Sequence, residues 1–304
     1  MDSKFSDLEI EDKSWIEKTL GNKMCSESAF GTHFIWSTAF NSKVCDYKGM
    51  FLKKFDKNGV FYEFPRGADC EESFKEAVKF IFDDAKNSGY RELRFTELLS
   101  SEMLEFSRLF PDKFEIIPRR DKYEYVYFSQ DLASLSGKKY HKKKNHVSKF
   151  SKTYDWKYVP TDSSETEKYM KFFEKWFKTR CPKKSYGEIP EYQAVKRAVE
   201  NYSELKLTGG KIEINGEIVA CTLGEKINEK IFLVHFEKAL PEYDGAYSVI
   251  NNEFAKTLSK EYQFINREED MGIPGLRKSK LSYKPVFLIP KYEAVLKDFE
   301  NDIF

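Results

Sequence analysis

Hydrophobic positions in the first part of the chain alternate between the spacing of helices and that of strands. Apolar side chains recur at helical spacing across residues 70–90 ("CEESFKEAVKFIFDDAKNSGY") and stop at Gly89, which predicts a long amphipathic helix. The Asn58-Gly59 step between two apolar runs favours a hairpin turn. The same patterns predict helices at 15–20 and 101–110, and strands at 49–55, 59–65, 91–98 and within 113–128.

The second part of the chain repeats this organisation from about Asp131 onward. Apolar and polar side chains alternate across residues 211–239 about Asn215-Gly216, which predicts an antiparallel meander. Helices are predicted at 164–179, 191–203 and 246–260, and strands at 263–266 and 285–292. We therefore expect an α+β protein with one domain over residues 1–130 and a similarly built one over 131–304, consistent with an ancient duplication.

Composition narrows the class of protein. The 304 residues are 40% hydrophobic and 33% charged, which is typical of a globular chain and not of a disordered one. The N-terminal stretch lacks the pattern of a signal peptide, and no apolar run approaches the roughly 20 residues of a membrane-spanning helix. The expected location is the cytoplasm. The five Cys are scattered and form no C-x-x-C pair, which argues against a disulfide framework and a zinc site. Only four His are present, and the spacing of two of them, at 141 and 146, does not suit a metal site.

Charge is concentrated locally, although the 51 cations and 50 anions nearly cancel. No acid lies between Asp131 and Asp155, a segment that is rich in lysine. On a helix, Tyr140, Val147 and Tyr154 would share one stripe and the lysines would cover the opposite face. Such a face is either simply solvated or holds phosphates, as in nucleic-acid binding. The candidate nucleic-acid-binding residues are Lys138, Lys139, Lys142, Lys143 and Lys144.

A second charged segment, "NREEDMGIPGLRKSKLSYKP" at residues 266–285, combines three acids and five cations with glycine and proline. The step Ile273-Pro274-Gly275 predicts a type II turn with glycine at a positive φ. Asp270 and Arg277 then either form a structural ion pair or take part in acid-base chemistry. The pattern leaves both readings open.

The late segments resemble a known family. "VHFEKALPEYDGAYSVINNEFAK" and the 266–285 motif resemble the C-terminal domain of phosphatidylglycerol lysyltransferases, and "SAFGTHFIWSTAF" and "YEFPRG" resemble stand-alone bacterial members. The resemblance implies two tandem GNAT-like (acyltransferase) domains, as in the Fem-type aminoacyltransferases, which take an aminoacyl group from charged tRNA. The positions that match the family blocks are Glu237, Gly245, Tyr247 and Asn251, then Asn266, Glu268, Asp270, Gly272, Gly275, Leu276, Arg277, Lys280 and Pro285.

The resemblance implies a direct transfer of an aminoacyl group from tRNA to an amine or hydroxyl of a small-molecule, peptide or lipid acceptor. Glu237 or Asp270 is the candidate general base, and Lys280, Arg277 and, as a second choice to Lys280, Lys284 would stabilise developing charge. The candidate substrate-binding residues are Gly245, Tyr247, Asn251, Asn266 and Glu268.

Two alternatives remain from the sequence. A coenzyme A-dependent N-acyltransferase would share the fold, but "LPEYDGAYSVI" carries one glycine where acetyl-CoA enzymes have a glycine-rich loop, so no cofactor is expected. A non-enzymatic tandem domain that binds an anionic ligand is the other. The chain also lacks the membrane-spanning part of the parent lysyltransferases, which argues against a lipid acceptor.

Overall fold

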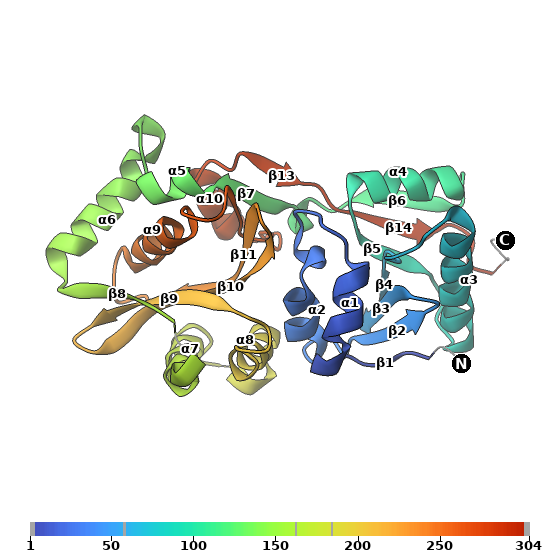
Figure 1. Ribbon diagram of the computed structural model, residues 1–304, viewed down its shortest axis with the longest axis horizontal. Coiled ribbons are helices and arrows are strands. Elements are labelled where there is room, and N and C mark those ends of the chain that lie inside the picture. The colour runs from blue at the N-terminus through green and yellow to red at the C-terminus, as the bar shows by residue number, and fades with distance from the viewer. Residues whose placement is uncertain (1–3, 57–58, 162, 184, 301–304) are drawn as a thin grey trace.

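The computed structural model describes residues 4–56, 59–161, 163–183 and 185–300, and Figure 1 shows two halves that lie side by side along its long axis. Each half is built on a seven-stranded sheet with helices on both faces. The chain is therefore α+β, as the sequence predicts.

The first sheet lies in the half that also holds the helices labelled α1 to α4 in Figure 1. Neighbouring strands are antiparallel except β4 and β5, which run parallel. In spatial order the strands are β1 (Ser6–Asp7), β2 (Lys43–Tyr47), β3 (Met50–Asp56), β4 (Val60–Glu63), β5 (Arg94–Leu98), β14 (Tyr292–Leu296) and β6 (Phe114–Pro118).

The second sheet has the same plan, with β11 and β12 as its parallel pair. In spatial order the strands are β8 (Trp156–Pro160), β9 (Thr208–Ile214), β10 (Glu217–Asn228), β11 (Ile231–Ala239), β12 (Phe264–Asn266), β7 (Glu124–Phe128) and β13 (Phe287–Ile289). In both sheets the parallel pair joins the fourth and fifth strands, which is the architecture expected of a duplicated unit.

One strand from the end of the chain returns to the first sheet, and the second sheet takes its first strand from before residue 130. β14, from the end of the chain, lies between β5 and β6 of the first sheet, and β7 lies between β12 and β13 of the second. The boundary predicted at residue 130 therefore needs two corrections. The second sheet begins at Glu124, and residues 292–296 belong to the first. Sequence patterns could not show this, because a strand's own alternation does not reveal its pairing partner.

The helices cover both faces of each sheet. They are α1 (Lys13–Thr19), α2 (Phe30–Ser37), α3 (Glu71–Asn87), α4 (Ser100–Leu109), α5 (Ser129–Ser134), α6 (His141–Thr153), α7 (Thr166–Arg180), α8 (Pro190–Glu200), α9 (Ala246–Leu258) and α10 (Pro274–Ser282). Short 3-10 turns are η1 (Ile10–Asp12), η2 (Ser26–Ser28), η3 (Arg120–Lys122), η4 (Lys138–Tyr140), η5 (Ser163–Glu165) and η6 (Tyr186–Glu188).

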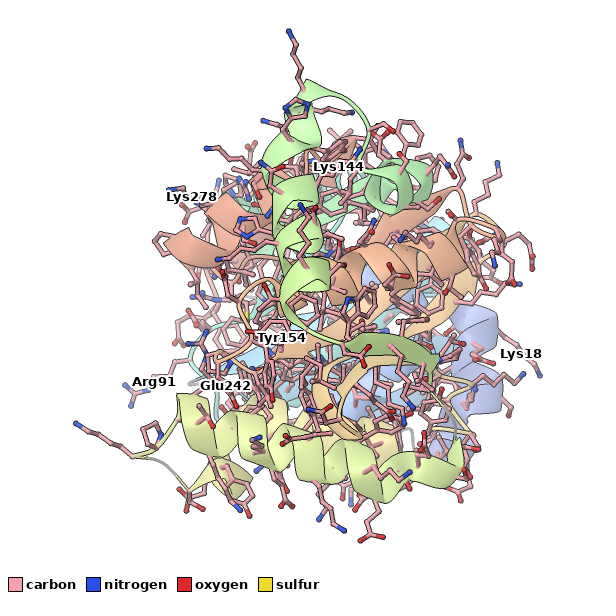
Figure 2. The ribbon with its side chains drawn as sticks, turned by 90° about the vertical axis from the view of Figure 1, so that its left-hand side faces the viewer. Lys18, Arg91, Lys144, Tyr154, Glu242 and Lys278 are labelled. Carbon is pink, nitrogen blue, oxygen red and sulfur yellow. The ribbon has the colours of Figure 1, made fainter. Side chains whose placement is uncertain are left out.

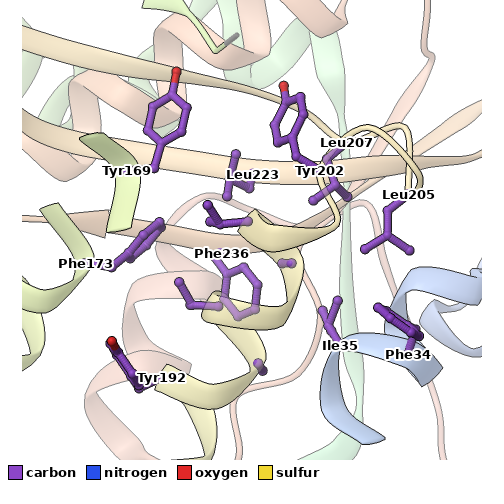
Figure 3. Close-up of a cluster of buried hydrophobic side chains, with 14 of the residues drawn as sticks. Phe34, Ile35, Tyr169, Phe173, Tyr192, Tyr202, Leu205, Leu207, Leu223 and Phe236 are labelled. Carbon is purple, nitrogen blue, oxygen red and sulfur yellow. The ribbon is translucent and has the colours of Figure 1, made fainter. Parts of the chain in front are cut away.

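One hydrophobic cluster joins the halves. Phe34 and Ile35 of α2 belong to the same buried cluster as Leu205 and Phe236 of the second half, and Figure 3 shows Phe34 and Ile35 on α2 near Leu205. Burial of large apolar side chains is the main favourable term in folding, at about 25 cal/mol per Å². A core shared in this way holds the halves together as one folded unit.

The predicted helices and strands are found with shifts of a few residues, and two local predictions are wrong. The segment 285–292 does not form one strand, because β13 and β14 enter different sheets. No type II turn forms at Ile273-Pro274-Gly275, because Pro274 opens α10, where its missing N–H costs nothing. Part of the predicted Asn58-Gly59 turn lies outside the described residues.

Candidate active site

The candidate site lies where the parallel strands of the second sheet separate. β12 pairs with β11 only from Ile231 to Leu233. The N–H of Arg267 then donates to the carbonyl of Tyr125, so the chain continues beside β7 while β11 runs on to Ala239. Side chains of β11 beyond the last pair are thus free to face the loop that follows β12.

Glu237 of β11 accepts hydrogen bonds from two side chains at the point where β11 and β12 separate. Its carboxylate accepts from Arg267 Nη2 at 2.7 Å and from Asn251 Nδ2 at 3.0 Å. Within the described part of the chain, Arg267 Nη1 and Asn251 Oδ1 are buried without a hydrogen-bond partner. Buried polar atoms are nearly always paired, so this free donor and this free acceptor beside a carboxylate leave two hydrogen bonds that a bound ligand or a water molecule would complete.

Tyr283 packs against two cations of the same cluster. Lys143 Nζ of α6 lies 3.9 Å from the centre of the Tyr283 ring, and the Arg267 guanidinium lies 4.9 Å from it. Burial, reinforced by the charge of Arg267, lowers the pKa of Lys143 to about 8. Lys143 is therefore distinct from its exposed neighbours Lys142 and Lys144, with which the sequence grouped it.

Lys280 fastens the loop after β12. Its Nζ donates to the main-chain carbonyls of Arg267 at 2.5 Å, Glu268 at 3.1 Å and Glu269. An ammonium group has three donors, and all three are used here. Burial lowers the pKa of Lys280 to about 8. Lys280 thus supports the main chain that presents Arg267, which differs from the free charge-stabilising lysine that the resemblance implied.

Asp270 closes the same loop. It is fully buried and accepts from both Arg277 Nε at 2.7 Å and Arg277 Nη2 at 2.8 Å, and from the Tyr125 hydroxyl at 2.5 Å. Burial alone would raise its pKa, but Arg277 and Tyr125 lower it to about 2. The ion pair is thus the reading that the structure shows, and Asp270 has no part in the mechanism proposed below.

The other predicted substrate-binding residues do not gather at Glu237. Buried Asn266 donates to the carbonyl of Met24 at 3.0 Å and to Glu124, so it links the two halves. Glu268 contacts His235 at 2.9 Å. Tyr247 is partly exposed on the first turn of α9.

Gly245 caps α9 beneath α6. A Cβ at this glycine would lie 3.0 Å from the carbonyl oxygen of His146, and the φ of 95° independently favours glycine. The His146 carbonyl of α6 therefore lies close to the residue at which α9 begins.

The lysine-rich segment forms η4 and α6 on the outside of the molecule. Tyr140, Val147 and Tyr154 face the core, as the sequence predicts. Figure 2 shows Lys144 on α6 and Lys278 on α10 on one face of the molecule. Lys139 is paired with Asp131 at 2.8 Å. Lys138 of η4, Lys142 of α6 and Lys284, which follows α10, are also exposed.

Sequence reasoning missed Arg267, Tyr283 and the inward position of Lys143. Arg267 and Tyr283 lie inside the quoted 266–285 motif, which was the available signal, but their partners Glu237 and Lys143 are remote in the chain. Over the described ranges, no group of three or more His, Cys, Asp or Glu side chains is placed to hold a metal ion. The helices described are all too short or too polar to cross a bilayer.

Together, the two matched sheets and the separated parallel strands define a tandem GNAT-like protein. Residues 20–295 match the family model for "Phosphatidylglycerol lysyltransferase, C-terminal", and the chain belongs to this family.

Solved structures agree with this assignment. A protein of unknown function from Bacteroides thetaiotaomicron is 32% identical, with a TM-score of 0.87 over 97% of this chain and 100% of that one. L-PGS from Bacillus licheniformis is 15% identical, with a TM-score of 0.68 over 96% and 93%. FemX is 7% identical, with a TM-score of 0.57 over 96% of each chain, and like L-PGS it shares the fold alone.

An uncharacterized protein of Mycoplasmoides gallisepticum is 28% identical over 173 residues, which are 55% of this chain and 54% of that protein. The match thus spans about half the length of this relative.

Proposed function

We propose that this protein transfers an aminoacyl group from aminoacyl-tRNA to an amine or hydroxyl acceptor at the Glu237 cluster. The observation that carries the proposal is the pair of buried, unpartnered atoms, Asn251 Oδ1 and Arg267 Nη1, on either side of the Glu237 carboxylate. An aminoacyl ester brings an ammonium group and a carbonyl oxygen. The ammonium donates to Glu237 and Asn251 Oδ1, and the carbonyl accepts from Arg267 Nη1.

The transfer is a direct displacement. The acceptor nitrogen or oxygen forms a bond to the ester carbonyl carbon, the bond from that carbon to the tRNA 3′ oxygen breaks, and the acceptor's proton passes to the departing oxygen. Lys143, with a pKa of about 8, exchanges protons near neutral pH and suits this relay. Arg267 stabilises the oxyanion, and Lys280 holds the loop that presents Arg267.

Two features around the cluster distinguish between the possible donors. Acetyl-CoA enzymes of this fold hold pyrophosphate at the helix that corresponds to α9, yet here the His146 carbonyl of α6 approaches that helix end. The exposed lysines of α6, among them Lys144 in Figure 2, instead offer a phosphate-binding face on the helix whose Lys143 contacts Tyr283 of the cluster. Both features favour tRNA over coenzyme A as the donor.

Charge reversal of Lys138, Lys142 and Lys144 to Glu is expected to weaken binding of charged tRNA at least tenfold at about 0.1 M salt, since each lost phosphate contact removes a counterion-release term. The salt dependence should flatten by roughly two to three units of slope. The matched control reverses Lys171, Lys178 and Lys196, which are exposed on α7 and α8. Binding is measured by filter retention or anisotropy at two salt concentrations.

Three outcomes separate the alternatives. Equal binding by both triple variants contradicts the α6 assignment. A thermal shift with acetyl-CoA and none with tRNA supports the coenzyme A-dependent enzyme. Ligand binding that survives Glu237→Gln, with no deacylation of tRNA by the wild type in the presence of any cell extract, supports a non-enzymatic binding domain.

A further inference from the structure

His235 is held between two carboxylates in the interior. Its side chain is 1% exposed, with Nε2 at 2.8 Å from Glu225 Oε1 and Nδ1 at 2.9 Å from Glu268 Oε1. A neutral imidazole has only one N–H, so donation to both carboxylates requires the imidazolium. Burial lowers the pKa of His235, but Glu225 and Glu268 outweigh it and raise the pKa to about 9.

Glu225 reaches the other half of the molecule. A Cβ built on Gly31 of α2 would lie 2.0 Å from Glu225 Oε1 and 2.9 Å from Oε2. Gly31 does not have a positive φ, so space and not backbone conformation requires glycine at this position. The Glu225 carboxylate thus occupies the place of a side chain on α2.

Glu268 reaches the candidate site. Its φ is 53°, an uncommon value for a residue with a side chain, and its carbonyl accepts from Tyr125 N at 3.1 Å and from Lys280 Nζ. The preceding residue is Arg267. Burial and, to a smaller extent, Glu269 raise the pKa of Glu268, while the charges of His235 and Lys280 oppose the rise and favour the carboxylate. A continuous carboxylate, imidazolium and carboxylate chain therefore connects α2 of the first half to the residue beside Arg267.

We propose that His235 is a positioning residue. As an imidazolium clamped by Glu225 and Glu268, it fixes the position of the Arg267 loop and makes that position depend on how α2 packs against Glu225. The clamp itself is independent of the proposed function, which enters only through the role given to Arg267. On this view the first half of the chain is needed for the geometry of a site that lies wholly in the second half. That requirement gives the hydrophobic core shared by the two halves a functional consequence.

The test is the titration of the His235 ring by ¹⁵N NMR in the full chain. We expect both ring nitrogens to be protonated at pH 7, with loss of the proton near pH 9. Glu225→Gln, which keeps the shape and removes one charge, should lower the midpoint by about one pH unit or more. Gly31→Ala should lower it as well by displacing Glu225, while Gly187→Ala, whose Cβ would meet nothing within 4 Å, should not.

A second readout follows the Arg267 Nε–H resonance, which should shift in Gly31→Ala and Glu225→Gln but not in Gly187→Ala. Glu225→Gln keeps the test valid if Gly31→Ala does not fold. A wild-type midpoint near 6.5, or a midpoint and an Arg267 signal that ignore both variants, would overturn the clamp. If the clamp titrates as expected but Arg267 variants transfer normally, the proposed function fails while the clamp stands.

Discussion

Replacing Arg267 by lysine is expected to slow aminoacyl transfer by about 10²- to 10³-fold, or roughly 3 to 4 kcal/mol of transition-state stabilisation, the usual cost of losing one oxyanion donor. Lysine keeps a positive charge beside Glu237 but cannot place two donors in a planar fork, so the donor corresponding to Nη1 is lost. The measurement is single-turnover deacylation of charged tRNA with the acceptor in excess. The loss should appear in the rate constant and not in tRNA affinity.

Arg277→Lys is the matched control for this variant. Arg277 lies on α10, directly after the same loop, and holds Asp270 in a bidentate pair, but Arg277 does not contact Glu237 in the described structure. We expect it to lower stability and to leave most of the transfer rate. Equal losses in the two variants would mean that the loop, and not the free Arg267 donor, sets the rate.

Replacing Lys291 by methionine is expected to destabilise the protein by about 3 to 5 kcal/mol, the cost of leaving a buried charge without its partner. Lys291 is 1% exposed, and its Nζ lies 2.6 Å from Glu124 Oε1, in contact with Glu27, and 3.9 Å from Glu97 Oε2. It stands in the crossing between β13 and β14, where its carbonyl accepts from Arg119 N at 2.9 Å. Urea denaturation at pH 7 measures the change.

Lys149→Met provides the comparison, because Lys149 is mostly exposed and forms a surface pair with Asp244. Surface pairs contribute little, so we expect almost no change in the urea midpoint. Adding Glu124→Gln to Lys291→Met should recover part of the loss, since one uncompensated charge is removed. A Lys291 variant as stable as the Lys149 variant would show that the buried cluster is not a stabilising link.

The Lys291 deficit should also depend on pH. Burial raises the pKa of Glu27, but Lys291 and Arg66 outweigh it and lower the pKa to about 2, so this group stabilises the fold above its ordinary pKa of 4.5 and the stabilisation is lost as pH falls toward 2. Burial raises the pKa of Glu124 to about 7. Without Lys291 the carboxyl groups take up protons more readily in the folded state. The deficit should therefore shrink as pH falls from 7 to 4.

The buried clusters explain why the site could be predicted only in part. The family motifs point to both Glu237 and Asn251, and the structure joins them by a hydrogen bond. The motifs also point to Lys280, but only its contacts with three carbonyls show that its donors are already used. Nothing in the sequence distinguishes Lys143 from the neighbouring lysines, because its contact with Tyr283 depends on how α6 packs in the folded protein.

By itself, the sequence determined the local elements and the class of fold, because helical and strand periods depend on which face of each segment is buried. It also determined the family, through motifs in which residues close in sequence act together. Only the tertiary structure decided which strands pair, so that β14 returns to the first sheet. It also decided which charges meet, so that Arg267 reaches Glu237 and His235 lies between Glu225 and Glu268. These contacts join residues remote in the chain, and no local pattern encodes such a distance.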